Sequence, residues 1–207
     1  DNKQGSEYLK KIGLTHQQAA NIAAPLPLYH VYAFMVHMLL FFGAGHHSLL
    51  IPNPRQLNDV VKVLKGYPLH GVVGINTLFA SMLDYEPIKT VDFSQLKITL
   101  AGGMAMQTSV AERWRALTNC PVVEGYRLTE ASPVVSLTPP ESGRIGTIGL
   151  LLADCEVKIA DEQGAPLPVG ERGELCVKGP QVMLGYWNNP DATASTIVDG
   201  WLLTGDI

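Results

Sequence analysis

The 207-residue chain lacks a basic run, a cysteine pair at metal-binding spacing and an apolar run long enough to cross a membrane. Lys and Arg number 15 against 19 Asp and Glu, and the net charge of −4 argues against a nucleic-acid partner. Cys120, Cys155 and Cys176 form no CxxC, which indicates neither a zinc site nor a disulfide framework and suits a reducing compartment. The longest apolar stretch, residues 31–42, contains His37 and falls short of the ~20 residues of a membrane span, so it predicts a buried helix.

The chain does have enough apolar material for a core, because 46% of its residues are hydrophobic and only 16% are charged. Through residues 1–138, short apolar runs typical of buried strands alternate with stretches whose apolar residues recur three or four apart. This alternation predicts an α/β fold with a mostly parallel layered sheet and helices. The expected strands are 72–73, 98–101 and one beginning at 121, and the expected helices are 31–42, 57–64 and 107–117.

The composition changes after residue 138. Gly and Pro account for 18 of residues 1–138 and for 16 of the 69 residues 139–207. Residues 155–159 alternate polar and apolar side chains, the turn signal 161–164 follows, and 174–178 form a second candidate strand. We therefore expect two domains: residues 1–138 as part of an α/β domain, and 139–207 as a small β-rich, barrel-like subdomain.

The expected strand 98–101 ends in Gly102 and Gly103. Ligands of open α/β sheets bind beyond the carboxyl ends of the strands. A glycine pair at that position either lets the backbone approach a ligand closely or only forms a tight turn. The residues alone leave both interpretations open.

The strand that begins at 121 runs into a tyrosine, a hydroxyl and a carboxylate, namely Tyr126, Thr129 and Glu130. These side chains could stack on a base, touch a phosphate and hold a hard cation. The alternative is a polar loop that ends in a helix start, with Thr129 as the capping residue. The sequence supports the two equally.

The stretch GYRLTE, residues 125–130, closely resembles the GYGxTE motif of adenylate-forming enzymes, the superfamily of acyl-CoA synthetases, luciferases and peptide-synthetase adenylation domains. Further matches occur in the same order and at the same spacing, which makes the set specific. They are residues 24–31, Gly102-Gly103, 173–187 with NPDAT following, and 200–207. Within the superfamily, the sequences of these stretches most resemble those of bacterial long-chain fatty acyl-CoA synthetases.

The resemblance implies a ligase that works in two steps. A fatty carboxylate attacks the α-phosphate of ATP, releases pyrophosphate and leaves acyl-AMP, and the thiol of coenzyme A then displaces AMP. The protein would position the reactants and neutralise phosphate charge, largely with Mg²⁺ and hydrogen-bond donors. The implied substrates are a fatty acid, ATP and coenzyme A.

The resemblance also implies roles for single residues. Tyr126 would stack on adenine with the Gly125 backbone beside it, and Gly102 and Gly103 would border the nucleotide, Gly102 the acyl group as well. Thr129 would contact the α-phosphate and Glu130 would ligate Mg²⁺, which makes these two the catalytic candidates. Asp206 would accept hydrogen bonds from the ribose hydroxyls, its alternative being a turn carboxylate after Gly205.

In this superfamily the stretch that contains His30 and Phe34 borders the acyl channel, with an aromatic gate at the Phe34 position in long-chain members. The pattern alone favours Phe34 as an ordinary core residue of helix 31–42. The other histidines lack a metal-ligand pattern and are interpreted as structural. Tyr186 and Trp187 are interpreted as core residues rather than cofactor contacts.

The chain departs from the family pattern in several places. The Ser/Thr/Gly-rich phosphate loop is not found in residues 1–23, and the hinge and C-terminal domain with its catalytic Lys would follow Asp206. We therefore expect a middle fragment that is inactive by itself. Inside the motif, Arg127 stands where the family has Gly, and it could narrow the acyl pocket or bind an anion.

Two alternatives to a long-chain ligase remain at this stage. One is a ligase of aryl or short-chain acids from the same superfamily, and the other is a non-catalytic acyl- or protein-binding module. The expected location is cytoplasmic. Peripheral contact with the inner membrane and a homodimer are left open, although no basic amphipathic helix supports the membrane contact.

Overall fold

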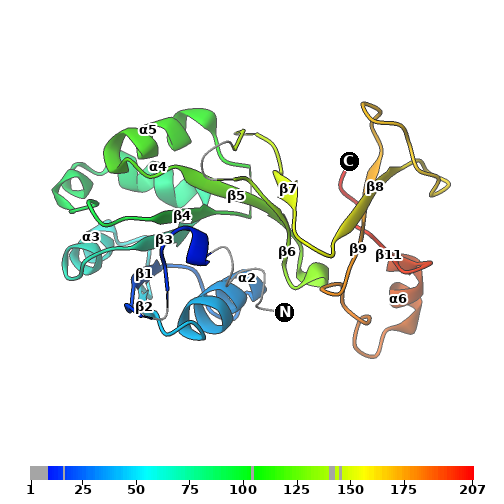
Figure 1. Cartoon of the computed structure of the whole chain (residues 1–207), viewed down its shortest axis with the longest axis horizontal. Coiled ribbons are helices and arrows are strands. Elements are labelled where there is room, and N and C mark those ends of the chain that lie inside the picture. The colour runs from blue at the N-terminus through cyan, green and yellow to red at the C-terminus, as the bar shows by residue number, and fades with distance from the viewer. Residues whose placement is uncertain (1–8, 16, 104, 140–142, 145) are drawn as a thin grey trace. The chain divides into compact units, whose positions relative to one another are not determined.

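The computed structural model describes residues 9–15, 17–103, 105–139, 143–144 and 146–207 (Figure 1). The chain divides into two compact units. Unit 1 consists of Asp1–Tyr126 and Ser136–Leu150, and unit 2 of Arg127–Val135 and Leu151–Ile207. The domain boundary expected after residue 138 stays a prediction.

The larger sheet has seven strands in the order β2-β1-β3-β4-β5-β6-β7. The pairs β1–β2, β1–β3, β3–β4 and β4–β5 are all parallel. This parallel-dominated sheet with its helices confirms the predicted α/β class. The strands are β1 (Asn21–Ala24), β2 (His47–Leu50), β3 (Gly71–Gly74), β4 (Ile98–Ala101), β5 (Val122–Arg127), β6 (Val134–Leu137) and β7 (Leu150–Leu151).

In unit 1, helices cover both faces of the sheet. Figure 1 shows α4 and α5 on one face and α2 on the other. Each face has its own core, and β3 and β4 are buried along their whole length, as the continuous apolar runs of parallel strands require. The helices are α2 (Val31–Ala33), the π-helix η1 (Phe34–Phe42), α3 (Leu57–Lys65), α4 (Asn76–Asp84), the 3₁₀ helix η2 (Glu86–Thr90) and α5 (Thr108–Thr118).

The core under α4 and α5 is built around Trp114 of α5, which has no exposed surface. Its ring meets those of Phe79 and Phe93 edge-on, at centroid distances of 4.8 and 5.6 Å. Its indole N–H donates to Thr99 Oγ1 of β4 at 3.0 Å, so the one polar atom of this large side chain is satisfied inside the core.

The prediction of a buried helix over 31–42 is correct in type and wrong in burial. The segment is helical, but most of it winds as a π-helix, and only one side faces the core, through residues such as Val36, His37 and Phe41. The other side exposes four large apolar side chains, because the segment packs against the sheet on one side only. These are Phe34, Met38, Leu39 and Phe42.

Unit 2 contains a four-stranded antiparallel sheet in the order β10-β11-β9-β8, which confirms the predicted small β-rich region. The expected turn follows β8: the Gly164 N–H donates to Asp161 O at 2.9 Å, and Asp161 Oδ1 accepts from Gln163 N–H at 3.0 Å. Its elements are β8 (Glu156–Ala160), β9 (Glu174–Lys178), β10 (Ile197–Val198), β11 (Trp201–Leu203), the short helix α6 (Pro190–Thr196) and the 3₁₀ turn η3 (Thr129–Ala131).

Across the described parts of the chain, no helix combines the length and the apolar character that crossing a bilayer demands.

Candidate functional site

In unit 1, the strand order locates one edge of the sheet as the place for a ligand. The order changes direction between β1 and β3, because β2 lies on one side of β1 and β3 on the other. In doubly wound sheets, ligands bind at the carboxyl ends of the strands that flank such a switch point. The segments that carry His30 and Gly102 begin at this edge, after β1 and β4.

The loop after β4 is fixed at both ends. The Gly102 N–H donates to Gly74 O at 3.2 Å, and Gly103 has a φ of +89°, a conformation that favours glycine. At the far end, the Met106 N–H donates to Glu124 Oε1 at 2.8 Å. The glycine pair thus lies at a bend beside the end of β3, and its contact with a ligand stays a prediction.

Glu124 and Asn76 are residues of this site that sequence reasoning missed. Both are buried, and Asn76 Oδ1 accepts the Gln107 N–H at 2.9 Å, next to the Met106 bond. The Glu124 backbone is tied in turn to Thr138, whose N–H donates to Glu124 O at 2.7 Å. The sequence did offer one signal for Glu124. It is a carboxylate inside an apolar strand pattern, and a buried carboxylate needs hydrogen-bond partners.

Gly125 is required by packing between strands. A Cβ at this position would lie 2.7 Å from Leu137 Cδ2 and 2.8 Å from the Ser136 carbonyl oxygen, so a larger residue would force β5 and β6 apart. Tyr126 follows on β5 and is half-buried. The nucleotide contacts expected of both residues stay predictions.

His30 and Phe34 lie one turn apart on the helix that follows β1. His30 caps α2, because its Nδ1 accepts the Tyr32 N–H at 3.2 Å, which leaves the ring proton on Nε2 in the neutral form. Phe34 is 45% exposed, so its interpretation as an ordinary core residue is wrong. An exposed aromatic beside the sheet's carboxyl edge agrees with the alternative of an acyl-channel residue, which stays a prediction.

In unit 2, Thr129 and Glu130 open the turn η3. The residue at the N-cap position is Leu128 and no side chain caps the turn, so the interpretation of Thr129 as a cap is wrong. Thr129 is exposed and Glu130 is half-buried. Their phosphate and metal roles stay predictions.

Glu130 is held by a distant segment of the same unit. Tyr186 Oη donates to Glu130 Oε1 at 2.8 Å, and the Met183 N–H donates to the Glu130 carbonyl oxygen at 2.8 Å. The hydrogen bond to Glu130 is the main cause that raises the pKa of the Tyr186 phenol. Tyr186 is 37% exposed and Trp187 is 94% exposed, so the interpretation of both as core residues is wrong. Gly185, with a φ of +152°, directly precedes them.

Asp206 lies in the segment that follows β11 and is exposed. The Leu175 N–H donates to the Asp206 carbonyl oxygen at 2.9 Å, and the Asp206 N–H donates to Thr204 Oγ1 at 3.1 Å. These backbone bonds fix the segment against the start of β9. They fit a turn carboxylate and a ribose ligand alike, so the ribose role stays a prediction.

His46 and His70 bond to the backbone and serve the fold. His46 Nδ1 and His70 Nδ1 accept the N–H groups of Ala20 and Asn21, at 3.2 and 3.1 Å. Burial lowers the pKa of His37 to about 4. The residues that the structure describes include no group of three or more His, Cys, Asp or Glu side chains that could hold a metal ion. The three cysteines are free, and burial raises the pKa of each thiol.

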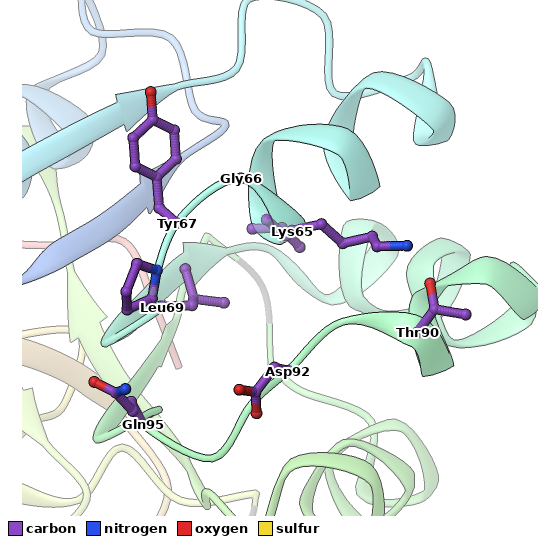
Figure 2. A pocket seen from close by; sticks show the side chains of 9 residues that line it. Lys65, Gly66, Tyr67, Leu69, Thr90, Asp92 and Gln95 are labelled. Carbon is purple, nitrogen blue, oxygen red and sulfur yellow. The ribbon is translucent and has the colours of Figure 1, made fainter.

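The described residues of unit 1 line cavities at both edges of the sheet. One of about 280 Å³ lies at the amino end of β3. Figure 2 shows residues that line it: Lys65 ends α3, Tyr67 follows two residues later, and Asp92 and Gln95 lie in the segment after η2. The other, of about 530 Å³, lies beyond the carboxyl ends of β1 and β2 and is lined by residues 24–28 and 50–55. The second lies on the edge where the candidate residues begin.

A model of a protein family described as "AMP-binding enzyme" matches residues 6–187 of this chain. The chain belongs to this family. The match includes every candidate residue of this AMP-binding chain except Asp206, because the matched region ends at residue 187.

Long-chain-fatty-acid–CoA ligases are among the known proteins to which this AMP-binding chain is similar. It is 46% identical over 193 residues to the long-chain-fatty-acid–CoA ligase of Haemophilus influenzae, covering 93% of this chain and 34% of that protein. It is 47% identical over 195 residues to the enzyme of the same name from Salmonella typhimurium, covering 94% and 35%. The chain thus spans about a third of the length of these relatives.

Among solved structures, the chain is similar to the anthranilate CoA ligase AuaEII in complex with anthranoyl-AMP, with a TM-score of 0.85 and 20% identity. The match covers 98% of this chain and 40% of that one. At this identity the likeness shows a shared fold.

Proposed function

We propose that this chain is the central part of an ATP-dependent long-chain fatty acid–CoA ligase. The observation that carries the proposal is the 46% identity to a long-chain-fatty-acid–CoA ligase over 93% of the chain. In the first step, a fatty carboxylate oxygen attacks the α-phosphorus of ATP and pyrophosphate leaves. In the second, the sulfur of coenzyme A attacks the acyl carbonyl carbon and AMP leaves.

On the nucleotide side, three residues would bind ATP. Tyr126 would stack on the adenine ring, and the Thr129 hydroxyl, which is exposed on η3, would donate to the α-phosphate. The Asp206 carboxylate, exposed after β11, would accept hydrogen bonds from the ribose hydroxyls. Gly102 and Gly103 would bring backbone close to the nucleotide, which agrees with the left-handed conformation of Gly103.

The donor chemistry of Glu130 fits a magnesium ion. Mg²⁺ in nucleotide sites takes one or two protein carboxylates and fills its other positions with phosphate oxygens and water, so a single carboxylate suits it as a protein ligand. Glu130 is half-buried and one of its oxygens already accepts a hydrogen bond, which orients the group. When bound, Mg²⁺ would neutralise charge on the phosphates. Glu130 would hold it in place.

On the acyl side, His30 and the exposed Phe34 would border the fatty acid channel, with Gly102 near the carboxylate. Arg127, at the end of β5, is the departure from the family motif. Its guanidinium would make the pocket narrower or more favourable to an anion than a glycine would. We further propose a cytoplasmic location, in agreement with three free thiols, and leave membrane contact and a homodimer open.

The acyl specificity is tested with the protein expressed from its complete reading frame. We expect ATP- and coenzyme A-dependent thioester formation to rise with chain length through a C2 to C18 series of acids. Turnover confined to aryl acids or to C2–C4 acids would replace the long-chain assignment with the rival ligase. Absence of ATP-dependent turnover on every acid, with acyl binding retained, would favour the non-catalytic module.

Single-turnover adenylation in the same full-length protein tests the residue roles. Glu130→Gln keeps the shape and removes the charge, so adenylate formation should fall by about 10²-fold or more, while fatty acid affinity hardly changes. Asp206→Asn should act mainly on ATP affinity, because ribose contacts are made before and during the reaction alike. An unchanged rate and unchanged Mg²⁺ dependence in Glu130→Gln would leave Glu130 as a turn residue.

The 207-residue chain by itself should form no acyl-adenylate and bind ATP weakly. The phosphate loop and the catalytic Lys of the family pattern are absent from its sequence, so the phosphates would lack their backbone cradle and the transferred group its cation. Pyrophosphate release by the purified chain above a no-enzyme blank would contradict this expectation.

A further inference from the structure

The carboxylate of Glu130 is oriented through one of its two oxygens. Tyr186 Oη donates to Oε1 at 2.8 Å, across 56 residues of sequence. Among the residues that the structure describes, no second donor bonds to the Glu130 side chain, so Oε2 keeps its lone pairs. A carboxylate held by one oxygen in this way presents the other as a single directed ligand.

The backbone of Glu130 is held by the same segment that holds its side chain. The Met183 N–H donates to the Glu130 carbonyl oxygen at 2.8 Å, three residues before Tyr186. A single residue thus receives a backbone bond and a side-chain bond from the stretch 183–186. Two contacts of this kind fix both the position of the turn η3 and the direction of its carboxylate.

Tyr186 is itself fixed before any ligand arrives. Its N–H donates to Thr193 Oγ1 at 2.9 Å, and Thr193 Oγ1 donates to Asn189 O at 2.9 Å, in the first turn of α6. Gly185 makes this approach feasible: it has a φ of +152°, and a Cβ there would lie 2.6 Å from Thr193 Cγ2. The start of α6 is capped in turn by Asn189 Oδ1, which accepts the Ala192 N–H at 3.2 Å.

We propose that Tyr186 is a positioning residue for Glu130: its hydroxyl holds Oε1 so that Oε2 points to the divalent cation of the bound nucleotide. This inference rests on the metal role given to Glu130 under the proposed function. Hydrogen bonds to ligating carboxylates and histidines orient the ligand, and their loss typically lowers metal affinity by about 10- to 100-fold. The stretch 183–186 therefore does more than support the β-rich unit, because it sets the direction of the metal ligand.

The proposal is tested by metal binding in the full-length protein, with Mn²⁺ as the probe. Free Mn²⁺ is measured by electron paramagnetic resonance in the presence of a non-hydrolysable ATP analogue. Tyr186→Phe removes only the hydroxyl and should raise the Mn²⁺ dissociation constant by about tenfold. The matched control is Tyr67→Phe, which removes a phenol hydroxyl from another half-exposed tyrosine and should leave the constant unchanged.

A double-mutant cycle separates positioning from general effects. Glu130→Gln should weaken Mn²⁺ binding at least as much as Tyr186→Phe, and the double variant should be no weaker than Glu130→Gln, since the hydroxyl acts only through the carboxylate. An unchanged constant in Tyr186→Phe with a weakened Glu130→Gln would overturn the positioning role and leave the proposed function standing. Unchanged constants in both variants would remove the metal role of Glu130, and this inference with it.

A second measurement does not depend on how the phenylalanine variant folds. With 3-fluorotyrosine at position 186 alone, the ¹⁹F resonance reports directly on the hydroxyl that donates a hydrogen bond to Glu130. Addition of Mg²⁺ to the complex with the ATP analogue should shift this resonance, and Glu130→Gln should abolish the shift. A resonance that Mg²⁺ leaves unmoved, or moves equally in Glu130→Gln, would overturn the proposal.

Discussion

Unit 1 fixes the loop after β4 with buried groups, whereas unit 2 fixes the turn η3 with groups near the surface. Glu124, which accepts the Met106 N–H, is only 8% exposed. Tyr186, which donates to Glu130, is 37% exposed. The first arrangement is part of the core, and the second is built on a glycine turn and a short helix beside it.

This difference in burial predicts that substitutions in the two units affect different properties of the protein. A change in the unit 1 core alters cavities and buried polar groups, whose costs reach several kcal/mol of folding free energy. A change in the exposed contacts of unit 2 alters the direction of a side chain and leaves most of the folding free energy in place. Substitutions in unit 1 should therefore be detected by unfolding, and those in unit 2 by ligand binding.

The largest effect is expected for Trp114→Ala. The ring is fully buried between Phe79 and Phe93, so its removal should lower the free energy of unfolding by about 3–5 kcal/mol. Trp187→Ala removes the same side chain from a position that is 94% exposed and should stay within about 0.5 kcal/mol of the parent. Urea unfolding of the chain measures both, and equal losses would refute the contrast between buried and exposed positions.

The next effect depends on pH. Burial lowers the pKa of His37 from 6.5 to about 4, so between these values the unfolded chain binds a proton that the folded chain does not. Stability should therefore fall as the pH drops from 6.5 to 4, by about 3 kcal/mol, and rise again as the pH is restored. His37→Leu should lack this part of the slope in urea unfolding, whereas the exposed His47→Gln should keep it. Parallel slopes in the parent and His37→Leu would rule the effect out.

A smaller loss is expected for Gly125→Ala. The new Cβ would lie 2.7 Å from Leu137 Cδ2 and 2.8 Å from a backbone oxygen, and the overpacking should cost about 1–3 kcal/mol. Gly66→Ala is the control, because its Cβ would meet only ordinary contacts at 3.5 Å and its φ of −74° suits alanine. If the two variants unfold at the same urea concentration, the packing explanation for Gly125 fails.

The smallest effect concerns the support of Tyr186. Asn189→Ala removes the side-chain cap of α6 and should cost about 1 kcal/mol, and Asn189→Ser, which keeps an oxygen acceptor, should cost only a few tenths. Chemical unfolding compares the two. A serine variant as unstable as the alanine variant would show that the cap oxygen contributes nothing.

Sequence patterns predicted the regular elements well where a local signal exists. The apolar run 98–101 coincides with β4 and the candidate strand 174–178 with β9, because both have consecutive buried apolar residues. The strands β1 and β2 were missed. β1 has only four residues, three of them alanine or isoleucine before a proline-rich loop, and β2 begins with a histidine.

The contacts of the candidate site were not predictable in the same way. The bonds from Tyr186 to Glu130 and from Met106 to Glu124 join residues 56 and 18 positions apart, and no periodicity encodes them. The resemblance to a family located Glu130, yet it assigned Tyr186 to the core, because an aromatic beside a strand is more often buried. Tertiary structure alone brings the phenol to the carboxylate.

The π-helix over Phe34–Phe42 gives this chain an uncommon route for evolutionary change. Its bonds span five residues, so deletion of one residue would let α-helical bonds close, and each later side chain would turn by about 100° around the axis. Side chains such as Phe42, which is 65% exposed, would exchange places with neighbours that now face the core. A change in length by a single codon, with no change in the kinds of residue present, would thus remodel the apolar surface beside His30.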